Sequence, residues 1–151
     1  MKFNNKIILL LIVSALFLIV SLSAVSATTD QVDSFTKLNE SISAGHDVEL
    51  NQTIIATSEE ASKFNSGIVI DHDVTIDGKG YSIDANNSMR IFEINNNDVL
   101  TLINITLKNG NAEKGGAIYA DGNVTINSDS SVIFTNNVAT GVLVALFLQR
   151  I

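Results

Sequence analysis

Short stretches in which apolar and polar residues alternate recur along the chain about every two dozen residues. The first set begins at four positions separated by 26, 26 and 24 residues: Val48, Val74, Leu100 and Val124. A second set begins at Ile54, Tyr81, Ile105 and Val132, and a third covers residues 68–70, 91–94 and 117–120. Because side chains alternate along a strand, each stretch predicts a short strand with one apolar face.

The order of these strands predicts a coil rather than a meander. Hairpins would pair neighbouring strands and would give no reason for every third strand to match in sequence. In a coil, the first strand of each turn stacks in parallel on the first strand of the next, about 4.8 Å away. We therefore expect an all-β fold over residues 47–140. It would be a right-handed parallel β-helix of about three and a half coils, with three strands per coil.

The breaks between strands are rich in Gly, Asn and Asp. These residues tolerate the left-handed backbone that tight corners need. Stacked Asn side chains can also hydrogen-bond along a coil, as in amide ladders. We interpret the abundance of Asn as structural, at four corners in particular: 77–80, 95–97, 109–111 and 121–123.

Residues 28–46 are expected to cap the coil. Val32, Phe35, Leu38 and Ile42 are spaced three or four residues apart, which predicts a helix over residues 30–44 with one apolar face. An open-ended coil exposes its core and an unpaired strand edge. A helix lying across that end would cover both.

The first 27 residues are typical of a secretory signal peptide. Lys2 and Lys6 precede an apolar run, residues 7–22, and small residues then lead to a cleavage site after Ala27. About 17 apolar residues can just span a bilayer, so an uncleaved anchor is the alternative. We expect a secreted or cell-surface protein that touches the membrane only through this segment.

Charge excludes one class of partner. The chain has 9 basic and 16 acidic residues, and only Lys2 and Lys6 precede residue 28, so residues 28–151 carry 7 − 16 = −9. Such an acidic chain lacks the basic footprint that nucleic acid requires. The absence of Cys excludes disulfides and thiolate zinc sites.

Several short segments resemble the repeats of known families of β-helical proteins. The residues GGAIYA (Gly115–Ala120) and FTNN (Phe134–Asn137) resemble the repeat of polymorphic outer-membrane proteins. The segments VTIDGKG (74–80) and LTLINITLKNG (100–110) resemble coils of pectin-lyase-like β-helices. The whole is similar to adhesin-like surface proteins of archaea. This resemblance implies a structural or binding role in surface attachment, with surface glycans or partner-cell proteins as partners.

The alternative is a fragment of a β-helical carbohydrate-active enzyme, a polysaccharide lyase or glycosidase. The repeat places Asp71, Asn95 and Asp121 at one corner, with the two carboxylates about 9.6 Å apart. This is near the outer limit of about 9.5 Å for an inverting glycosidase pair. No Arg or His matches these positions, so we expect no catalytic residue. We also expect no cofactor and no metal, because His46 and His72 lie in predicted turns without a ligand set.

Five sequons are possible glycan acceptors in an exported protein. Such sequons also arise by accident in a chain rich in Asn, Ser and Thr. We regard Asn86 as the most accessible of the five: Asn39, Asn51, Asn86, Asn104 and Asn123.

The connection between second and third strands is the longest in each complete coil. These connections, at residues 57–67, 84–90 and 108–116, would project from one edge as loops. Loops on a rigid scaffold commonly carry recognition.

Residues 141–151 form an aberrant apolar tail, with 8 apolar residues among 11 and no Asn. A segment of this length is too short to span a bilayer. Val142 lies 25 residues after Ala117, so the tail could add a strand to the third set. We expect that a frameshift or premature stop produced it, because solenoids normally end in a polar capping repeat.

Overall fold

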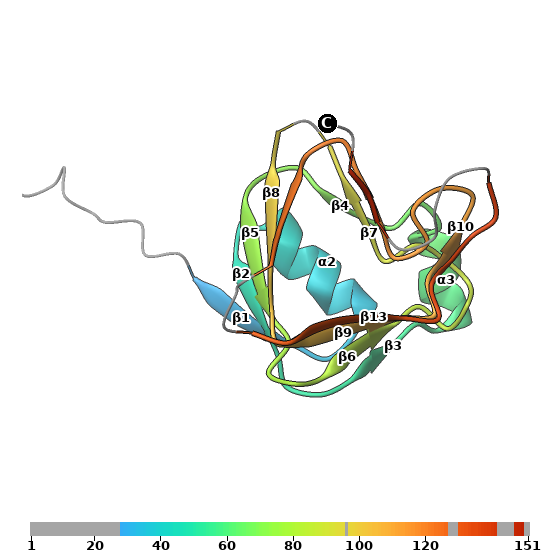
Figure 1. Cartoon of the computed structure of the whole chain (residues 1–151). Coiled ribbons are helices and arrows are strands. Elements are labelled where there is room, and N and C mark those ends of the chain that lie inside the picture. The colour runs from blue at the N-terminus through green and yellow to red at the C-terminus, as the bar shows by residue number, and fades with distance from the viewer. Residues whose placement is uncertain (1–27, 96, 127–129, 142–146, 150–151) are drawn as a thin grey trace, which may run out of the picture.

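The computed structural model describes residues 28–95, 97–126, 130–141 and 147–149. Parallel strands wind into a β-solenoid of about three turns, so the predicted parallel β-helix is confirmed. Three sheets surround one apolar core (Figure 1).

The sheets collect equivalent strands from successive coils, and every pairing is parallel. The first sheet contains β1 (Thr29–Val32), β2 (Asp47–Leu50), β5 (Val74–Asp77), β8 (Val99–Ile103) and β12 (Asn123–Ile126). The second contains β3 (Ile54–Ile55), β6 (Ser82–Asp84), β9 (Ile105–Lys108) and β13 (Val132–Thr135). The third contains β4 (Ile68–Ile70), β7 (Phe92–Ile94), β11 (Ile118–Ala120) and β15 (Phe147–Gln149).

The predicted register is confirmed in the later coils and in the third sheet, and it is wrong for the first coil in the first and second sheets. Val74 pairs with Leu100 as expected, but Val48 pairs with Ile76, two residues beyond the predicted Val74. Likewise Ile54 pairs with Ile83, two residues beyond the predicted Tyr81. A slip of two residues keeps every side chain on the same face, so the apolar pattern cannot detect it.

The core consists of the inward-facing side chains of successive coils. Burying one such side chain contributes about 1.5–3 kcal/mol relative to leaving it exposed. The largest members include Phe92, Leu50, Ile70, Ile76, Ile83 and Met89, all almost completely buried.

The capping helix is present but shorter than expected. It is α2 (Phe35–Ser43), with Ser34 as the N-cap, and Phe35, Leu38 and Ile42 are fully buried. The predicted start at residue 30 is wrong, because residues 29–32 form β1 and extend the first sheet beyond β2. Val32 is buried in either arrangement, so its spacing from Phe35 could not distinguish strand from helix.

The two ends of the chain are described only in part. The predicted signal peptide, residues 1–27, lies outside the described residues. Within the described part, no helix is long and apolar enough to cross a membrane. Three tail residues form β15, in which Phe147 pairs with Ile118. The tail therefore adds a strand to the third sheet, as expected, but this strand begins five residues after Val142.

Candidate functional site: the connection face

The connections between the second and third sheets lie side by side along one side of the solenoid. We call this surface the connection face, and it comprises residues 56–67, 85–91, 109–117 and 136–141. It occupies the right-hand side of Figure 1, where α3 (Ser58–Lys63) and β10 (Asn111–Ala112) are labelled. The expectation that these segments share one edge is confirmed. The expectation that they are loops holds for residues 85–91 and is wrong for the first and third connections, which contain α3 and β10.

The first connection contains a capped helix rather than a loop. Thr57 is the N-cap of α3, and it forms a capping box with Glu60. One carboxylate oxygen of Glu60 accepts hydrogen bonds from the nitrogen and hydroxyl of Thr57, at 3.1 and 2.9 Å. Burial alone would raise the pKa of Glu60, but the hydrogen bonds from Thr57 and Thr36 outweigh it and lower that pKa. The spacing T-x-x-E is a known helix-start signal, so the sequence contained this information.

The later connections continue the ladder of hydrogen bonds beyond the three sheets. β10 pairs in parallel with β14 (Val138–Ala139), one coil further on. The Nδ2 of Asn111 donates to the carbonyl oxygen of Asn87 at 3.2 Å. The connection face is therefore held by backbone pairing between coils.

The Asn of the FTNN motif joins two coils. Asn137 is buried, its Oδ1 accepts from the Gly110 nitrogen at 2.8 Å, and its Nδ2 donates to the Leu107 carbonyl oxygen at 3.0 Å. Across this contact the backbones approach very closely. A Cβ on Gly116 would overlap the carbonyl oxygen of Val138, and one on Gly110 would overlap that of Gly116. The two motifs behind the resemblance thus have a structural role.

Asn occupies left-handed corners, but only Asn109 does so at a predicted corner, and the predicted corner residue Asn123 begins β12 instead. Of the six described non-glycine residues with positive φ, five are Asn: Asn86, Asn87, Asn104, Asn109 and Asn136. The Asn side chains that bridge neighbouring coils do not pair with one another as in an amide ladder. Asn109 donates from Nδ2 to Asp84 at 2.8 Å, and the partners of Asn111 and Asn137 are backbone groups.

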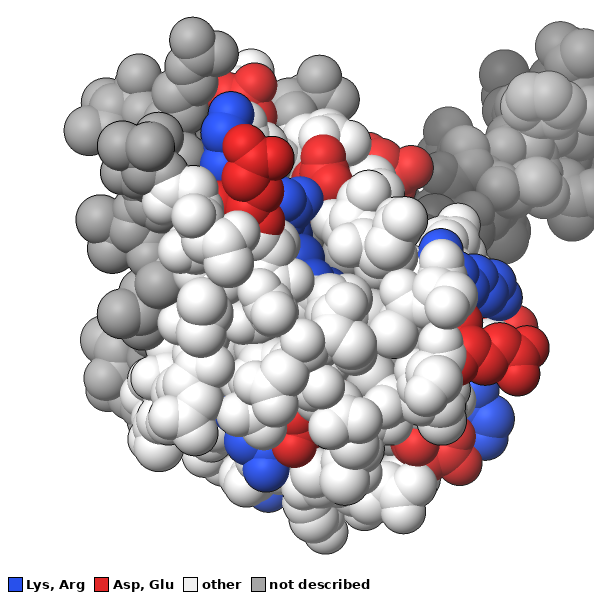
Figure 2. All heavy atoms as spheres, turned by 90° about the vertical axis from the view of Figure 1, so that its right-hand side faces the viewer, with Lys and Arg blue, Asp and Glu red and all other residues white. Residues whose placement is uncertain are grey.

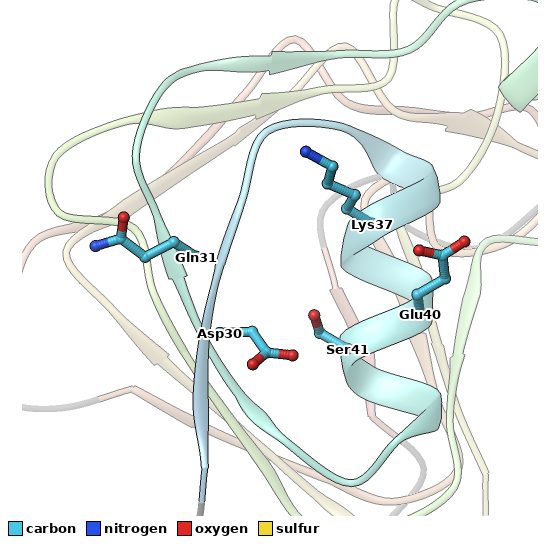
Figure 3. Close-up of a pocket in the computed structure, with 5 residues that line it drawn as sticks. All are labelled: Asp30, Gln31, Lys37, Glu40 and Ser41. Atoms are coloured by element: carbon cyan, nitrogen blue, oxygen red, sulfur yellow. The ribbon is translucent and has the colours of Figure 1, made fainter.

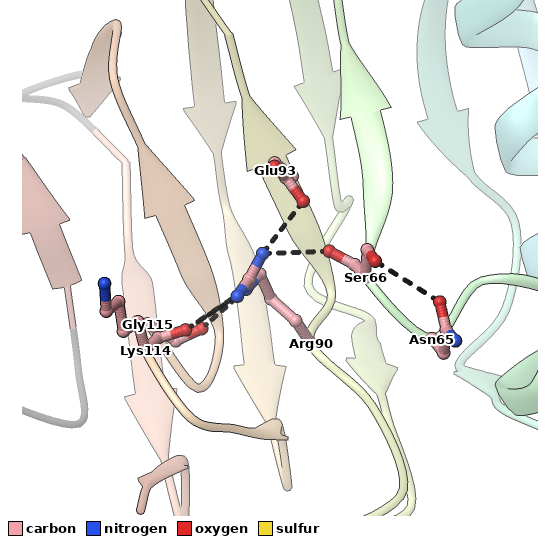
Figure 4. Close-up of polar contacts among 6 residues, drawn as sticks. All are labelled: Asn65, Ser66, Arg90, Glu93, Lys114 and Gly115. Carbon is pink, nitrogen blue, oxygen red and sulfur yellow. Dashed lines mark hydrogen bonds and ion pairs between the residues drawn. The ribbon is translucent and has the colours of Figure 1, made fainter. Parts of the chain in front are cut away.

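Arg90 fastens three coils at the border of this face (Figure 4). Its guanidinium donates to carbonyl oxygens of Ser66 at 3.0 Å and Lys114 at 3.0 Å, one coil away on either side. It also donates to Glu93 at 2.9 Å and lies 5.0 Å from the ring centre of Tyr119. Sequence reasoning missed this role, because nothing local to Arg90 indicates which backbone carbonyls it meets.

The exposed surface of the connection face is mainly polar and uncharged. Figure 2 shows this side with uncharged residues across its centre and Lys, Arg, Asp and Glu toward its margins. The exposed Asn and Ser residues here are Ser58, Ser62, Asn65, Ser66, Asn86, Asn87, Ser88, Asn111 and Asn136. They lie on successive coils.

Shallow depressions mark this surface, including one of about 440 Å³ between α3 and the start of α2 that is lined partly by Glu59, Glu60 and Lys63. Another, of about 430 Å³, is lined by Ser58, Ala61, Ser62, Asn86 and Ser88. A third, of about 330 Å³, lies at the charged border and is lined by Ser66, Arg90, Glu93, Glu113, Lys114 and Tyr119. The depression beside Asn86 offers hydroxyl and amide groups alone, which can both donate and accept hydrogen bonds.

A further depression, of about 280 Å³, lies between β1 and α2 (Figure 3). Here Asp30 points from β1 toward Ser41 of α2. The Oδ2 of Asp30 is 2.8 Å from Nδ1 of His46, and hydrogen bonds from His46 and Ser41 lower the pKa of Asp30. These contacts fasten β1 to the capping helix, so we interpret this pair as structural.

The residues of the enzyme alternative share a corner, as the repeat predicted. The backbone N–H of Asp121 donates to the carbonyl oxygen of Ile94, and that of Asn95 donates to the carbonyl oxygen of Ile70. Asp71, Asn95 and Asp121 are therefore in register on successive coils. The Oδ1 of Asp71 is 2.8 Å from Nδ1 of His72. Within the described residues, no group of three or more His, Cys, Asp or Glu is arranged to hold a metal ion.

The five sequons occupy different surroundings. Asn39 lies in α2 and is half-buried, and its Ser41 is buried. Asn123 is exposed in β12. Asn51, Asn86 and Asn104 are exposed outside strands, at a bend or corner. Glycosylation of any of them stays a prediction.

In comparisons with known proteins, no family model, no curated protein and no solved structure matches the chain.

Proposed function

We propose that the protein is exported and acts at the cell surface as an adhesin-like β-helix. Its connection face would bind surface glycans or proteins of a partner cell. The observation that carries this proposal is the uncharged, hydrogen-bonding surface formed by Asn and Ser on successive coils of an otherwise acidic chain. The resemblance of the GGAI and FxxN motifs to surface-protein repeats agrees with it.

The chemistry of this surface suits neutral, polyhydroxylated ligands. An Asn amide offers an acceptor and two donors, and a Ser hydroxyl offers a donor and two acceptors. These groups match the hydroxyls of a sugar without burying a charge, which would be costly. The depression beside Asn86 is shallow and continues across coils, so it suits an extended chain better than a small enclosed molecule.

Rigidity also favours binding. Backbone pairing of β10 with β14 and the bridge made by Asn137 fix the polar groups in place before a ligand arrives. A surface that is ordered in advance loses less conformational entropy on binding.

A pair of matched variants tests the proposal. Asn86 and Asn104 are both exposed, both have a left-handed backbone (φ 53° and 45°), and both begin sequons. Only Asn86 lies on the connection face. Residues 28–151, which contain the whole described fold, would be applied to an array of neutral and acidic oligosaccharides together with the N86D and N104D variants.

We expect binding to neutral oligosaccharides that is weakened at least about tenfold by N86D and unchanged by N104D, since about 1.4 kcal/mol is a tenfold change. Absence of binding to every glycan would contradict the glycan-binding role. Equal loss in both variants would place binding elsewhere. Shortening of an oligosaccharide during the assay would favour the carbohydrate-active enzyme instead.

A further inference from the structure

The chain contains one Asn–Gly pair, Asn109–Gly110, and this pair is chemically labile. The backbone nitrogen of a glycine can attack the side-chain Cγ of the asparagine before it, and glycine hinders the attack least because it has no Cβ. The N–Cγ bond forms as the Cγ–Nδ2 bond breaks. Ammonia leaves with the proton of the glycine N–H, and a succinimide ring remains. Water then opens the ring to aspartate or isoaspartate, so the reaction needs no oxidant or cofactor.

In the folded chain, hydrogen bonds hold both reacting groups away from this reaction. The Gly110 nitrogen, which would be the nucleophile, is buried and donates to Oδ1 of Asn137 at 2.8 Å. The Asn109 amide, which would be attacked, donates from Nδ2 to Oδ1 of Asp84 at 2.8 Å. Closing the ring would break both bonds and would leave the buried Asn137 acceptor without its donor, which is unfavourable.

The backbone of the pair is clamped as well. The Asn109 nitrogen donates to the carbonyl oxygen of Thr135 at 3.2 Å, and the Gly110 carbonyl oxygen accepts from the Val138 nitrogen at 2.8 Å. These bonds, like the one to the Gly110 nitrogen, come from residues 135–138 on the neighbouring coil. They therefore restrain the pair only while this segment, the 135–138 segment, stays in place.

We propose that Asn109–Gly110 is a latent deamidation site that acts as a one-way switch. The 135–138 segment shields it in the folded chain, and Asn137 is the residue that blocks the nucleophile. The pair reacts when the segment separates from it, and the product prevents the two from joining again. Separation without global unfolding is expected in a solenoid, because each coil contacts mainly its neighbours.

The product would fit the folded chain poorly. Aspartate at position 109 would place a carboxylate where Nδ2 now lies 2.8 Å from Oδ1 of Asp84, and like charges this close repel. Isoaspartate would add one carbon to the main chain. There is no space for it, since even a Cβ on Gly110 would overlap the carbonyl oxygen of Gly116. Either product therefore opposes closure of the segment.

The first test is peptide mapping of residues 28–151 after incubation in mildly alkaline buffer, both folded and in concentrated urea. Trypsin releases residues 109–114, and fragment masses show whether Asn109 or Asn111 has exchanged its NH₂ for OH. We expect Asn109 to react at least about tenfold more slowly in the folded chain than in urea, because the rate follows the population of the open form. Equal rates in the two conditions would overturn the proposal.

A pair of variants separates the shield from overall stability. N137A removes the bond to the Gly110 nitrogen and should speed deamidation of Asn109 in the folded chain at least about tenfold. R90K is the matched control, because it also loosens contacts between coils but leaves the Asn137 bond in place. We expect at most about a twofold change in R90K. Equal acceleration by the two variants would assign the protection to overall stability and would refute the role of Asn137.

The second test examines the product and does not depend on N137A. N109D should lower the urea midpoint by roughly 0.5–1 M, and D84N in the same chain should restore part of the loss by removing the like charge. N111D is the control, because Asn111 is exposed and meets only a backbone carbonyl oxygen, so its midpoint should change less. Equal midpoints for N109D and N111D would mean that the fold tolerates the product, and the switch would not be one-way.

Discussion

The carboxylate of Glu60 in α3 accepts two hydrogen bonds from Thr36 in the first turn of α2, from its backbone nitrogen at 3.0 Å and from its hydroxyl at 3.2 Å. The other oxygen of the same carboxylate closes the capping box on Thr57. One buried side chain therefore begins one helix and holds the N-terminus of another, 24 residues earlier. This contact couples the capping helix to the connection face.

Replacing Glu60 by Gln should lower the free energy of unfolding by about 2 kcal/mol, because hydrogen bonds to charged groups contribute more than neutral ones. The NH₂ group of the Gln side chain would also face the N–H and O–H donors of Thr36 or Thr57 with donors of its own. Urea unfolding followed by circular dichroism measures the change. The control is E59Q, in the same first turn but exposed, with an expected loss below about 0.5 kcal/mol. Equal losses would show that the Thr36 contact contributes nothing.

Acid should weaken the fold through Glu60 and Asp84. Burial would raise the pKa of each carboxyl, but hydrogen bonds from Thr57 and Thr36, and from Asn109 and Asn86, lower both pKa values below the ordinary 4.5 and 3.8. At pH values between the lowered and the ordinary pKa values, the unfolded state therefore binds more protons than the folded state. The contribution of these two carboxylates to the free energy of unfolding is therefore complete above about pH 4.5. It is lost as the pH drops through their folded pKa values.

The measurement is the urea midpoint as a function of pH. Because E60Q has no carboxyl at that position, its midpoint should decline less steeply below pH 4.5 than that of the parent chain. Parallel declines in the two proteins would contradict the role given to Glu60.

Asn137 should be the most sensitive Asn of the connections. Its replacement by Ala leaves the Gly110 nitrogen and the Leu107 carbonyl oxygen without their partner in a buried place. An unsatisfied buried group costs about 1–3 kcal/mol, so we expect a loss of about 3 kcal/mol in urea unfolding. N111A is the control, because Asn111 also bridges two coils but is exposed. A loss as large in N111A would mean that burial of the bridge is unimportant.

Periodicity alone predicted the coil and most of its register. The third sheet pairs Ile68, Phe92 and Ile118 as expected, because both neighbouring coils have nearly the same length. The first coil was misaligned by two residues at Val48 and Ile54, since a slip of two leaves the apolar face unchanged. Asn at positive φ was predictable from the conformational tolerance of that residue.

Contacts between distant segments were not predictable. β1 forms because β2 offers it an edge, and no pattern within residues 29–32 distinguishes that strand from a helix start. The bridges of Arg90 and Asn137 depend on which backbone groups the coil brings beside them. The helix α3 was missed although Thr57 and Glu60 gave its signal, because the connection was treated as a loop.

Arg90 provides the last test, since no other basic side chain can repeat its contacts. Its guanidinium is planar and donates in three directions, to Ser66 on one coil, to Lys114 and Gly115 on another, and to Glu93. A Lys ammonium is a point charge on a flexible stem and cannot reach these acceptors together. R90K should therefore lower the free energy of unfolding by about 2–3 kcal/mol, although the charge is kept. The control is K114A, because the Lys114 side chain is exposed and only its carbonyl oxygen accepts from Arg90, so its urea midpoint should be unchanged. A midpoint for R90K equal to that of the parent chain would mean that charge alone, rather than the geometry of the guanidinium, joins the three coils.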